Sequence, residues 1–422
     1  MERLIFHVDV NSAYLSWESV RRVQAGLSDL RLVPSCIGGN PESRRGIVLA
    51  KSIPAKKYNI RTGEPISMAL RKCPSLVIAK PDFKLYSSCS RAFKEICRNY
   101  APAMEEFSID ECFMDLTGTG VMYPDPIVLA NEIKNRIRDE LGFTVNIGIA
   151  QNKLCAKMAS DFEKPDRVHT LFPEEIPAKM WPLAVGDLLF IGGSSVRRLN
   201  DAGIRTIGDL AHASPDLLKS LLGRKMSVQA WNYANGIDNA PVRSEPEEAK
   251  GYSNSVTLEE DVKDLETANG VLLALADSVT AHMRSDGKKA WCVTVSIRYL
   301  DFKTRSHQRK LDYPVESTKD VYTTAKQLLT ELWKDRMPLR LMGIALTNLT
   351  REEPGEQISF FGENSGENRE KNVRLDKAVD ALRNKFGSDI IQRGTVMSSG
   401  LNVARRFKGL QDSAEEDQES ES

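Results

Sequence analysis

Three acidic side chains lie where predicted strands give way to turns, and their types suit chemistry with a divalent cation. Asp9 ends the first predicted strand, and Asp110 and Glu111 stand in the turn of a hairpin predicted over residues 104–116. Adjacent strand residues point to opposite faces, so both hairpin acids reach one site only if the turn redirects one of them. Converging carboxylate oxygens suit Mg²⁺, and two such ions about 3.5–4 Å apart support in-line phosphoryl transfer. Taken singly, each acid is also explained as an ordinary turn residue.

The pattern around these acids predicts an α/β or α+β region over roughly residues 1–168. Apolar runs that suit strands alternate with segments of helical period, and one pair of strands forms the hairpin. The predicted strands cover residues 3–10, 47–50, 77–78, 104–109, 112–116 and 144–150, and predicted helices start near residue 12 and cover 84–100, 126–141 and 153–162.

Two further regions and a tail follow. Short helical patterns with Gly and Pro indicate a small all-helical region over 173–235, and residues 238–250 contain prolines and acids without a clear period, which is typical of a linker. Residues 251–350 predict the order βαββαβ, which occurs in compact domains that present one sheet face. The polar tail after Arg351 contains one hydrophobic peptide and a predicted helix over 374–386.

Composition narrows the class of protein. A chain of 422 residues is too long for one core and predicts two to four domains. We find no run of the roughly 20 apolar residues that a membrane span needs, nor the basic start and apolar run of a signal peptide. Seven cysteines without a CxxC pair argue against a disulfide framework and a cysteine zinc site. We therefore expect a cytoplasmic protein with no membrane partner.

The neutral net charge conceals an uneven distribution. Six acids and no base lie in residues 412–422, so the rest of the chain has 58 bases against 52 acids and a charge of +6. Eight basic residues lie between Arg284 and Lys310, against only Asp286 and Asp301. A patch of this kind can contact phosphates, although a charge run by itself is more often an ordinary solvated face.

Five segments in order resemble the Y-family DNA polymerases. They are DVNSAY at 9–14, SIPAKKYNI at 52–60, SIDE at 108–111, AQNKLCAKMAS at 150–160 and EKP at 163–165. The resemblance covers residues 1–350 and, through the hydrophobic tail peptide, nearly the whole chain.

This resemblance implies a multi-domain α/β fold. It implies an α+β palm with a ferredoxin-like βαββαβ core, a small fingers region, an all-helical thumb and a C-terminal βαββαβ little-finger domain. The expected bounds are palm 1–32 and 78–168, fingers 33–77, thumb 169–237, linker 238–250, little finger 251–350 and tail 351–422.

The resemblance also implies the reaction and its central residues. A member of this family is a DNA-directed DNA polymerase that carries out error-prone translesion synthesis by two-metal transfer from a dNTP to a primer 3′-hydroxyl, without proofreading. By similarity, Asp9, Asp110 and Glu111, with the carbonyl of Val10, hold two Mg²⁺ ions. Tyr14 corresponds to the steric gate, an aromatic ring that clashes with a ribose 2′-hydroxyl.

Lys56 and Lys164 are the candidates for contact with the triphosphate. Lys56 stands where many members have arginine, so a bidentate grip on phosphate is weakened. Ile53 stands where many members have a phosphate-binding tyrosine, which leans towards the branch containing the catalytic subunit of bacterial polymerase V. The choice between polymerase IV-like and polymerase V-like roles stays open.

Contacts with macromolecules are expected in the second half of the chain. The thumb would hold duplex phosphates, although residues 190–195 depart from the family's glycine pattern. In the basic stretch, Arg298, Lys303, Arg305 and Arg309 are candidate DNA contacts, which would give affinity without sequence preference.

The tail peptide Gln357-Ile358-Ser359-Phe360-Phe361 resembles the peptide that binds the bacterial sliding clamp. The expected partners are thus primer–template DNA, dNTPs and the clamp, and we expect a monomer.

Two other interpretations of the chain remain. One is a nucleotide cyclase with a palm-type set of carboxylates, and the other is a DNA-binding module without catalysis.

Overall fold

The computed structural model describes residues 2–40, 46–245, 247–351, 365–387, 390, 391 and 393. The chain divides into two compact units, unit 1 (Met1–Glu42 and Gly46–Pro246) and unit 2 (Ser43–Arg45 and Glu247–Ser422). Each unit is described by itself. In the part of the chain that the structure describes, no helix is both long and apolar enough to cross a membrane.

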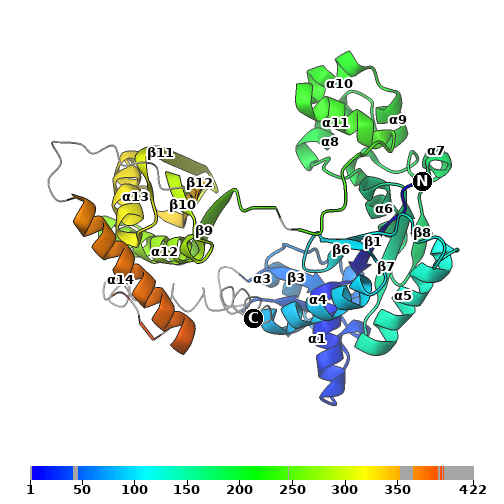
Figure 1. The fold of residues 1–422 in the computed structure, drawn as a ribbon, viewed down its shortest axis with the longest axis horizontal. Helices are drawn as coiled ribbons and strands as arrows, with labels where there is room; N and C mark the ends of the chain where they lie inside the picture. Colours follow the sequence, from blue (N-terminus) through cyan, green and yellow to red (C-terminus); the bar gives the residue numbers. More distant parts are fainter. Residues whose placement is uncertain are drawn as a thin grey trace. The chain divides into compact units, whose positions relative to one another are not determined.

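A five-stranded sheet of order β5-β6-β1-β7-β8 forms the centre of unit 1 (Figure 1). The strands β5, β6, β1 and β7 are antiparallel to one another in that order, and β8 runs parallel to β7. With α4 and α5 these four strands give the connection βαββαβ in ferredoxin-like order, as the family resemblance implied. The bounds are β1 Ile5–Val10, α4 Phe83–Arg98, β5 Ala103–Glu106, β6 Glu111–Asp115, α5 Pro126–Leu141, β7 Val145–Ala150 and β8 Val168–Thr170.

Both faces of this sheet are covered, so the central strand β1 is buried along its whole length. Phe6 and Val8 pack into one core with α4 and α5, while Ile5 belongs to a second core with α6 (Lys153–Ser160). Because strand side chains alternate, His7 and Asp9 share the face of Ile5 and point towards α6.

Gly148 lets α6 approach the sheet closely. It lies on β7 opposite His7 of β1, and a Cβ at this position would lie 2.0 Å from the carbonyl oxygen of Ala156 in α6. Any side chain here would therefore push α6 away from the sheet, and with it every residue that α6 directs towards β1.

A smaller sheet of order β3-β2-β4 lies between α1 (Ala13–Gln24) and α4 in the sequence. Its apolar cluster includes Cys36, Val48 and Ile66. The bounds are β2 Ser35–Gly38, β3 Val48–Lys51, α2 Ile53–Lys56, α3 Ile66–Lys72 and β4 Val77–Ala79. We did not predict β2, because its four residues show no alternation and run into a second glycine.

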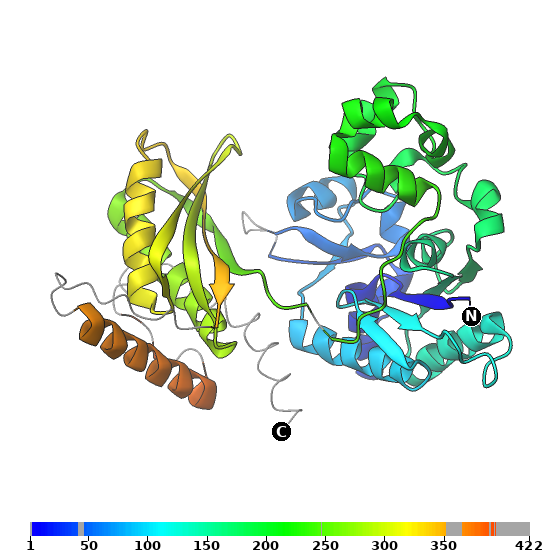
Figure 2. The same cartoon turned by 45° about the horizontal axis from the view of Figure 1, so that its top comes forward.

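The region predicted to be all-helical is confirmed, and Figure 2 shows it in green as a cluster of short helices. Thr206 and Asp209 form a reciprocal capping box, and Ser214 caps the helix that starts at Pro215, so local sequence starts these short helices. The helices are α7 Ile176–Lys179, α8 Gly193–Asp201, α9 Ile207–His212, α10 Pro215–Leu222 and α11 Arg224–Ala234.

Unit 2 has the predicted order βαββαβ and forms an antiparallel sheet of order β11-β10-β12-β9. The helices α12 and α13 share one core with Val293, Val295 and Ile297 of β10, so both pack on the same sheet face. The bounds are β9 Gly251–Val262, α12 Leu265–Ser285, β10 Lys289–Tyr299, β11 Thr304–Val315, α13 Thr318–Leu332 and β12 Leu339–Thr350.

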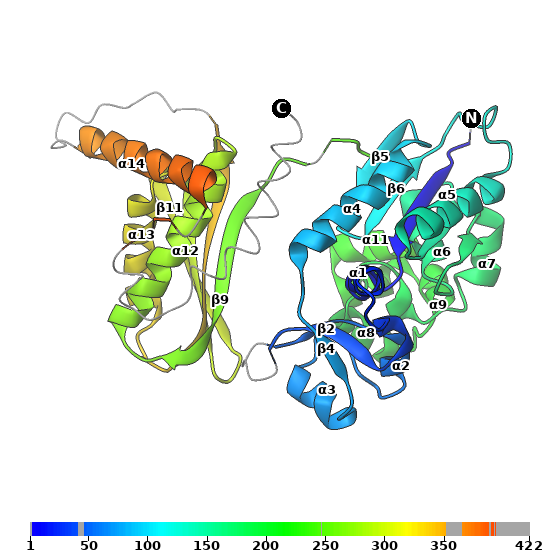
Figure 3. The same cartoon turned by 90° about the horizontal axis from the view of Figure 1, so that it is seen from below.

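A last helix, α14 (Ser365–Phe386), starts nine residues before the predicted one and lies along α12 and α13 (Figure 3). Ion pairs hold it there: Arg284 of α12 contacts Asp376 at 3.5 Å and Asp380 at 2.8 Å. Asp376 also accepts a hydrogen bond from the backbone N–H of Thr318 at the start of α13. Charged groups are therefore a substantial part of what holds this helix on unit 2.

Candidate active site

Asp9 and Glu111 face each other across two paired strands. They are direct partners in the antiparallel register of β1 and β6. Side chains of such partners lie on the same face of a sheet, here the face that α6 covers. The site is thus fixed by backbone pairing between residues that are far apart in the sequence.

Two lysines meet these acids. The Nζ atom of Lys157, on α6, lies 3.3 Å from Oδ2 of Asp9 and is in contact with Oε1 of Glu111. Lys164 approaches from the following loop, with its Nζ atom 3.0 Å from the same Asp9 oxygen. Both lysines also contact Asp161, at 3.5 Å and 2.8 Å.

Burial and the neighbouring lysines set the protonation of Asp9 and Glu111. Burial raises the pKa of Glu111 to about 7, with the Asp9 carboxylate adding to the effect of burial and Lys157 opposing it. Burial also favours the neutral form of Asp9, but Lys164 and Lys157 outweigh it and lower its pKa. Burial opposes the charge of Lys157, yet the adjacent carboxylates raise its pKa. Two carboxylates this close are ionised together only with more positive charge beside them.

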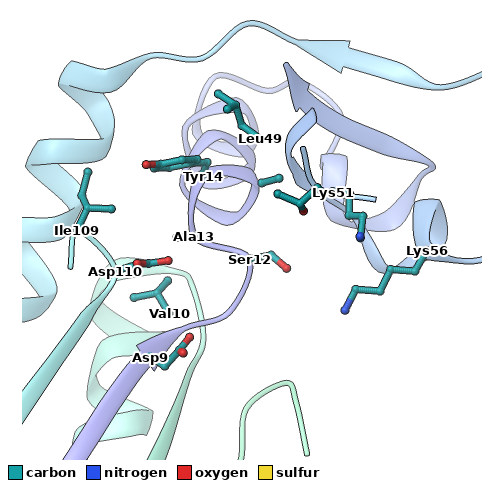
Figure 4. Close-up of a pocket in the computed structure, with 12 residues that line it drawn as sticks. Asp9, Val10, Ser12, Ala13, Tyr14, Leu49, Lys51, Lys56, Ile109 and Asp110 are labelled. Carbon is teal, nitrogen blue, oxygen red and sulfur yellow. The ribbon is translucent and has the colours of Figure 1, made fainter. Parts of the chain in front are cut away.

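Asp110 reaches the site from the hairpin turn. The backbone N–H of Val10 donates to the carbonyl of Asp110 at 3.0 Å, and the hydroxyl of Ser108 donates to its carboxylate at 2.7 Å. Asp110 lines a pocket together with Asp9 and Val10, as Figure 4 shows, whereas Glu111 joins Asp9 on the α6 side. The turn therefore brings Asp110 to the pocket beside Asp9, whereas the pairing of β1 with β6 brings Glu111 to Asp9.

Convergence of the three acids is incomplete in this structure. Among the residues that it describes, no three His, Cys, Asp or Glu side chains gather as a metal-binding group. An ammonium group, that of Lys157, lies between two of the expected ligands instead.

The pocket encloses about 430 Å³ between the central sheet and the smaller one. One wall comes from the start of α1 and the acidic turn, and the other from β3 and α2. The residues that line it are Asp9, Val10, Ser12, Ala13, Tyr14, Leu49, Ala50, Lys51, Lys56, Thr62, Ile109 and Asp110.

Tyr14 lies on the pocket wall formed by the start of α1, in the first turn of that helix, as predicted. Its ring stacks on Tyr86 of α4, with centroids 4.6 Å apart and planes at 19°, and it packs edge-on against Phe83. Burial and then the Asp110 carboxylate raise the pKa of Tyr14, which places phenol and acid in one environment. The ring is thus held in one orientation at the edge of the pocket.

Lys56 lines the opposite wall together with Lys51, which the sequence reasoning missed. Neither lysine forms an ion pair with another residue that the structure describes. Burial and then Lys56 lower the pKa of Lys51, so two cations face the same space. The signal for Lys51 was its place as the last residue of β3, next to the Ser52 cap of α2.

The four candidate DNA contacts of unit 2 separate into two groups. Arg298 lies on β10 between core residues, so it points away from α12 and α13, and Lys303 is exposed in the hairpin turn. Arg305 and Arg309 pair with core positions of β10 and point to the helix side instead. There Arg305 contacts Asp335 at 3.2 Å, and Arg309 contacts Glu331 at 2.6 Å.

The candidate clamp peptide, residues 357–361, lies outside the described residues, as does the acidic end from 412 to 422.

Comparison with known families assigns most of the chain. Residues 8–161 match the impB/mucB/samB family, and residues 249–360 match the C-terminal domain of the same family. Residues 187–238 match a thumb domain described for DNA polymerase-iota.

Individual relatives match nearly end to end. DNA polymerase IV of Clostridium acetobutylicum is 42% identical over 398 residues, which cover 94% of this chain and 99% of that protein. DNA polymerase IV of Acetivibrio thermocellus is 35% identical, and the match covers 95% of this chain and the whole length of that protein. A solved structure of a Y-family DNA polymerase chimera matches with a TM-score of 0.72 at 24% sequence identity. The match covers 83% of this chain and the whole of that chain, and it supports the fold.

Proposed function

The chain belongs to the Y-family, the impB/mucB/samB family of translesion DNA polymerases, and on that basis we propose that Asp9, Asp110 and Glu111 form its catalytic centre. It is a DNA-directed DNA polymerase, and the proposal concerns how its residues carry out synthesis. The observation that carries it is the pairing of Asp9 with Glu111 beside a pocket that Asp110 and Tyr14 line.

The donor set fits magnesium. Asp9, Asp110 and Glu111 offer only oxygen ligands, which a hard divalent cation prefers. We expect these acids, with the carbonyl of Val10, to hold two Mg²⁺ ions. When bound, such ions activate the primer hydroxyl and neutralise charge on the triphosphate.

The pocket walls have separate tasks in this proposal. Tyr14 excludes a ribose 2′-hydroxyl by its bulk. Lys56, assisted by Lys51, attracts the triphosphate from one wall, and Lys164, which contacts Asp9 but does not line the pocket, is a further triphosphate contact. Lysine suits this task because a flexible point charge can follow a polyphosphate that changes position during the reaction.

The remaining regions would hold the nucleic acid. We assign residues 1–32 and 78–168 to the palm, 33–77 to the fingers, 169–237 to the thumb and 251–350 to the little finger. Arg298 is the better placed of the candidate phosphate contacts, because Arg305, Arg309 and Lys303 each pair with an acid of unit 2. We further propose that residues 357–361 bind the sliding clamp, and that the enzyme is a cytoplasmic monomer without proofreading.

Primer extension tests the proposal. The wild-type protein should extend a primed template with dNTPs and Mg²⁺, and nucleotide alone should give no cyclic product, which separates a polymerase from a cyclase. Asp110→Ala should fold normally, because the turn hydrogen bond from Val10 uses the backbone carbonyl. It should lose extension by several orders of magnitude. A folded Asp110→Ala protein with wild-type extension rates would refute the assignment.

A further inference from the structure

Lys157 stands where a cation bound to Asp9 and Glu111 would have to be. It is the one ammonium among the described residues that contacts both carboxylates. Its side chain is only 11% exposed, and those of Asp9 and Glu111 are 9% and 16% exposed. Water therefore screens these contacts weakly, and the positive charge of Lys157 is felt strongly at the acids.

Lys164 has a different position. Of the two proposed ligands it contacts only Asp9, its side chain is 33% exposed, and it extends from the loop after α6. Lys157 is instead fixed on α6, which Gly148 allows to lie close against β7. The location of Lys157 between the acids is thus a property of the fold.

Asp161 provides Lys157 with a second partner. It lies one turn further along the chain, and its Oδ2 atom is 3.5 Å from the lysine Nζ atom. The Asp161 side chain is 48% exposed, so it faces the open side of the site. A lysine that leaves Asp9 and Glu111 can therefore remain ion-paired with Asp161, which also contacts Lys164 at 2.8 Å.

We propose that Lys157 is a built-in competitor of the divalent cation, which holds Asp9 and Glu111 together until a metal ion displaces it towards Asp161. This inference rests on the proposed function, because it takes Asp9 and Glu111 as metal ligands. Lys157 weakens metal binding to the enzyme without nucleotide and prevents two unscreened carboxylates from facing each other in the metal-free protein.

Loss of the Lys157 charge should therefore have two linked effects. The acids of a Lys157→Met protein keep only Lys164, at Asp9, as a counter-ion, and Glu111 has none, so this variant should be less stable than the wild type in EDTA. The same variant should bind Mn²⁺ about tenfold more tightly or better, because the metal no longer competes with a buried cation. Added Mn²⁺ should then raise its unfolding temperature more than that of the wild type.

The experiment measures Mn²⁺ binding by electron paramagnetic resonance and thermal unfolding with and without Mn²⁺, using the full chain without DNA or nucleotide. Lys157→Gln is a second charge-removing variant in case Lys157→Met folds poorly, and Lys157→Arg keeps the charge. Lys153→Met is the matched control. Lys153 lies one turn earlier on α6, is 15% exposed and pairs with Glu105 instead of the proposed metal ligands.

Tighter Mn²⁺ binding in Lys157→Met or Lys157→Gln, with Lys153→Met and Lys157→Arg close to the wild type, is the expected result. Unchanged or weaker binding in both charge-removing variants would overturn the proposal. An Asp9→Asn protein separates the two claims. If Asp9→Asn loses Mn²⁺ binding while Lys157 variants leave it unaltered, only the Lys157 proposal fails. If neither wild type nor variants bind Mn²⁺ up to millimolar concentrations, the metal-site assignment fails as well.

Discussion

Tyr14 is held at the pocket edge by its stacking on Tyr86 and its contact with Phe83, so its ring cannot turn aside without losing aromatic contacts. A side chain that excludes a hydroxyl group by bulk works only if it is held in this way. The geometry therefore supports selection of deoxyribonucleotides by steric exclusion.

We predict that Tyr14→Ala incorporates ribonucleotides about tenfold more readily, relative to deoxyribonucleotides, than the wild type. Tyr14→Phe is the control, since it keeps the ring and removes only the hydroxyl. The measurement is single-nucleotide incorporation with rNTP and dNTP. Wild-type discrimination in Tyr14→Ala would show that the gate lies elsewhere.

Sequence patterns located the acids and Tyr14 but missed the pairing of Lys157. The three acids stand at strand ends and carry their own local signal, as does an aromatic residue in the first turn of a helix. Lys157 follows Asp9 by 148 positions, and only the packing of α6 on the sheet brings their side chains together. A charged residue among the buried neighbours Cys155, Ala156 and Met158 of α6 was the available signal.

At the scale of elements, the sheet of unit 2 separates its basic residues by register. Residues of β11 that pair with Val293, Val295 or Ile297 must point to the helix side, and Arg305 and Arg309 are among them. Arg298 lies at an alternate position of β10 and points to the opposite face. The basic stretch noted in the sequence therefore divides into cations that face the helices and cations that do not.

We predict that Arg298→Ala weakens binding to primer–template DNA and lowers the slope of log affinity against log salt by about 1. Arg309→Ala, whose guanidinium contacts Glu331 and Gln327, should leave both quantities nearly unchanged. Fluorescence anisotropy over a series of salt concentrations measures both. Equal losses in the two variants would contradict the division by register.

The elements themselves were largely predictable, and the exceptions have local causes. Long segments with a helical period, such as α5, were predicted to the residue. The short strands β2 and β8 have three or four residues each and exist because a neighbouring strand pairs with them. Such strands carry too few residues to show a period of two.

At the scale of the whole chain, the tail peptide is a candidate for a function separate from catalysis. Residues 357–361 combine Ile358, Phe360 and Phe361 in an otherwise polar stretch between β12 and α14. An apolar peptide in such surroundings is well suited to docking on a partner.

We predict that deletion of residues 357–361 abolishes stimulation by the sliding clamp and leaves unstimulated primer extension unchanged. Deletion of residues 418–422, five residues of the acidic end, is the matched control and should keep the stimulation. Primer extension with and without clamp gives both rates. Equal loss of basal and stimulated synthesis would argue that the peptide supports the fold instead.

The central claim is that Asp9, Asp110 and Glu111 meet around divalent cations beside the pocket. Anomalous diffraction from crystals grown with primer–template, a non-hydrolysable dNTP and Mn²⁺ tests it most directly. We predict two manganese peaks within bonding distance of these three carboxylates, with the Lys157 ammonium no longer between Asp9 and Glu111. Manganese bound only elsewhere, or acids that still hold Lys157 beside a bound nucleotide, would contradict the account.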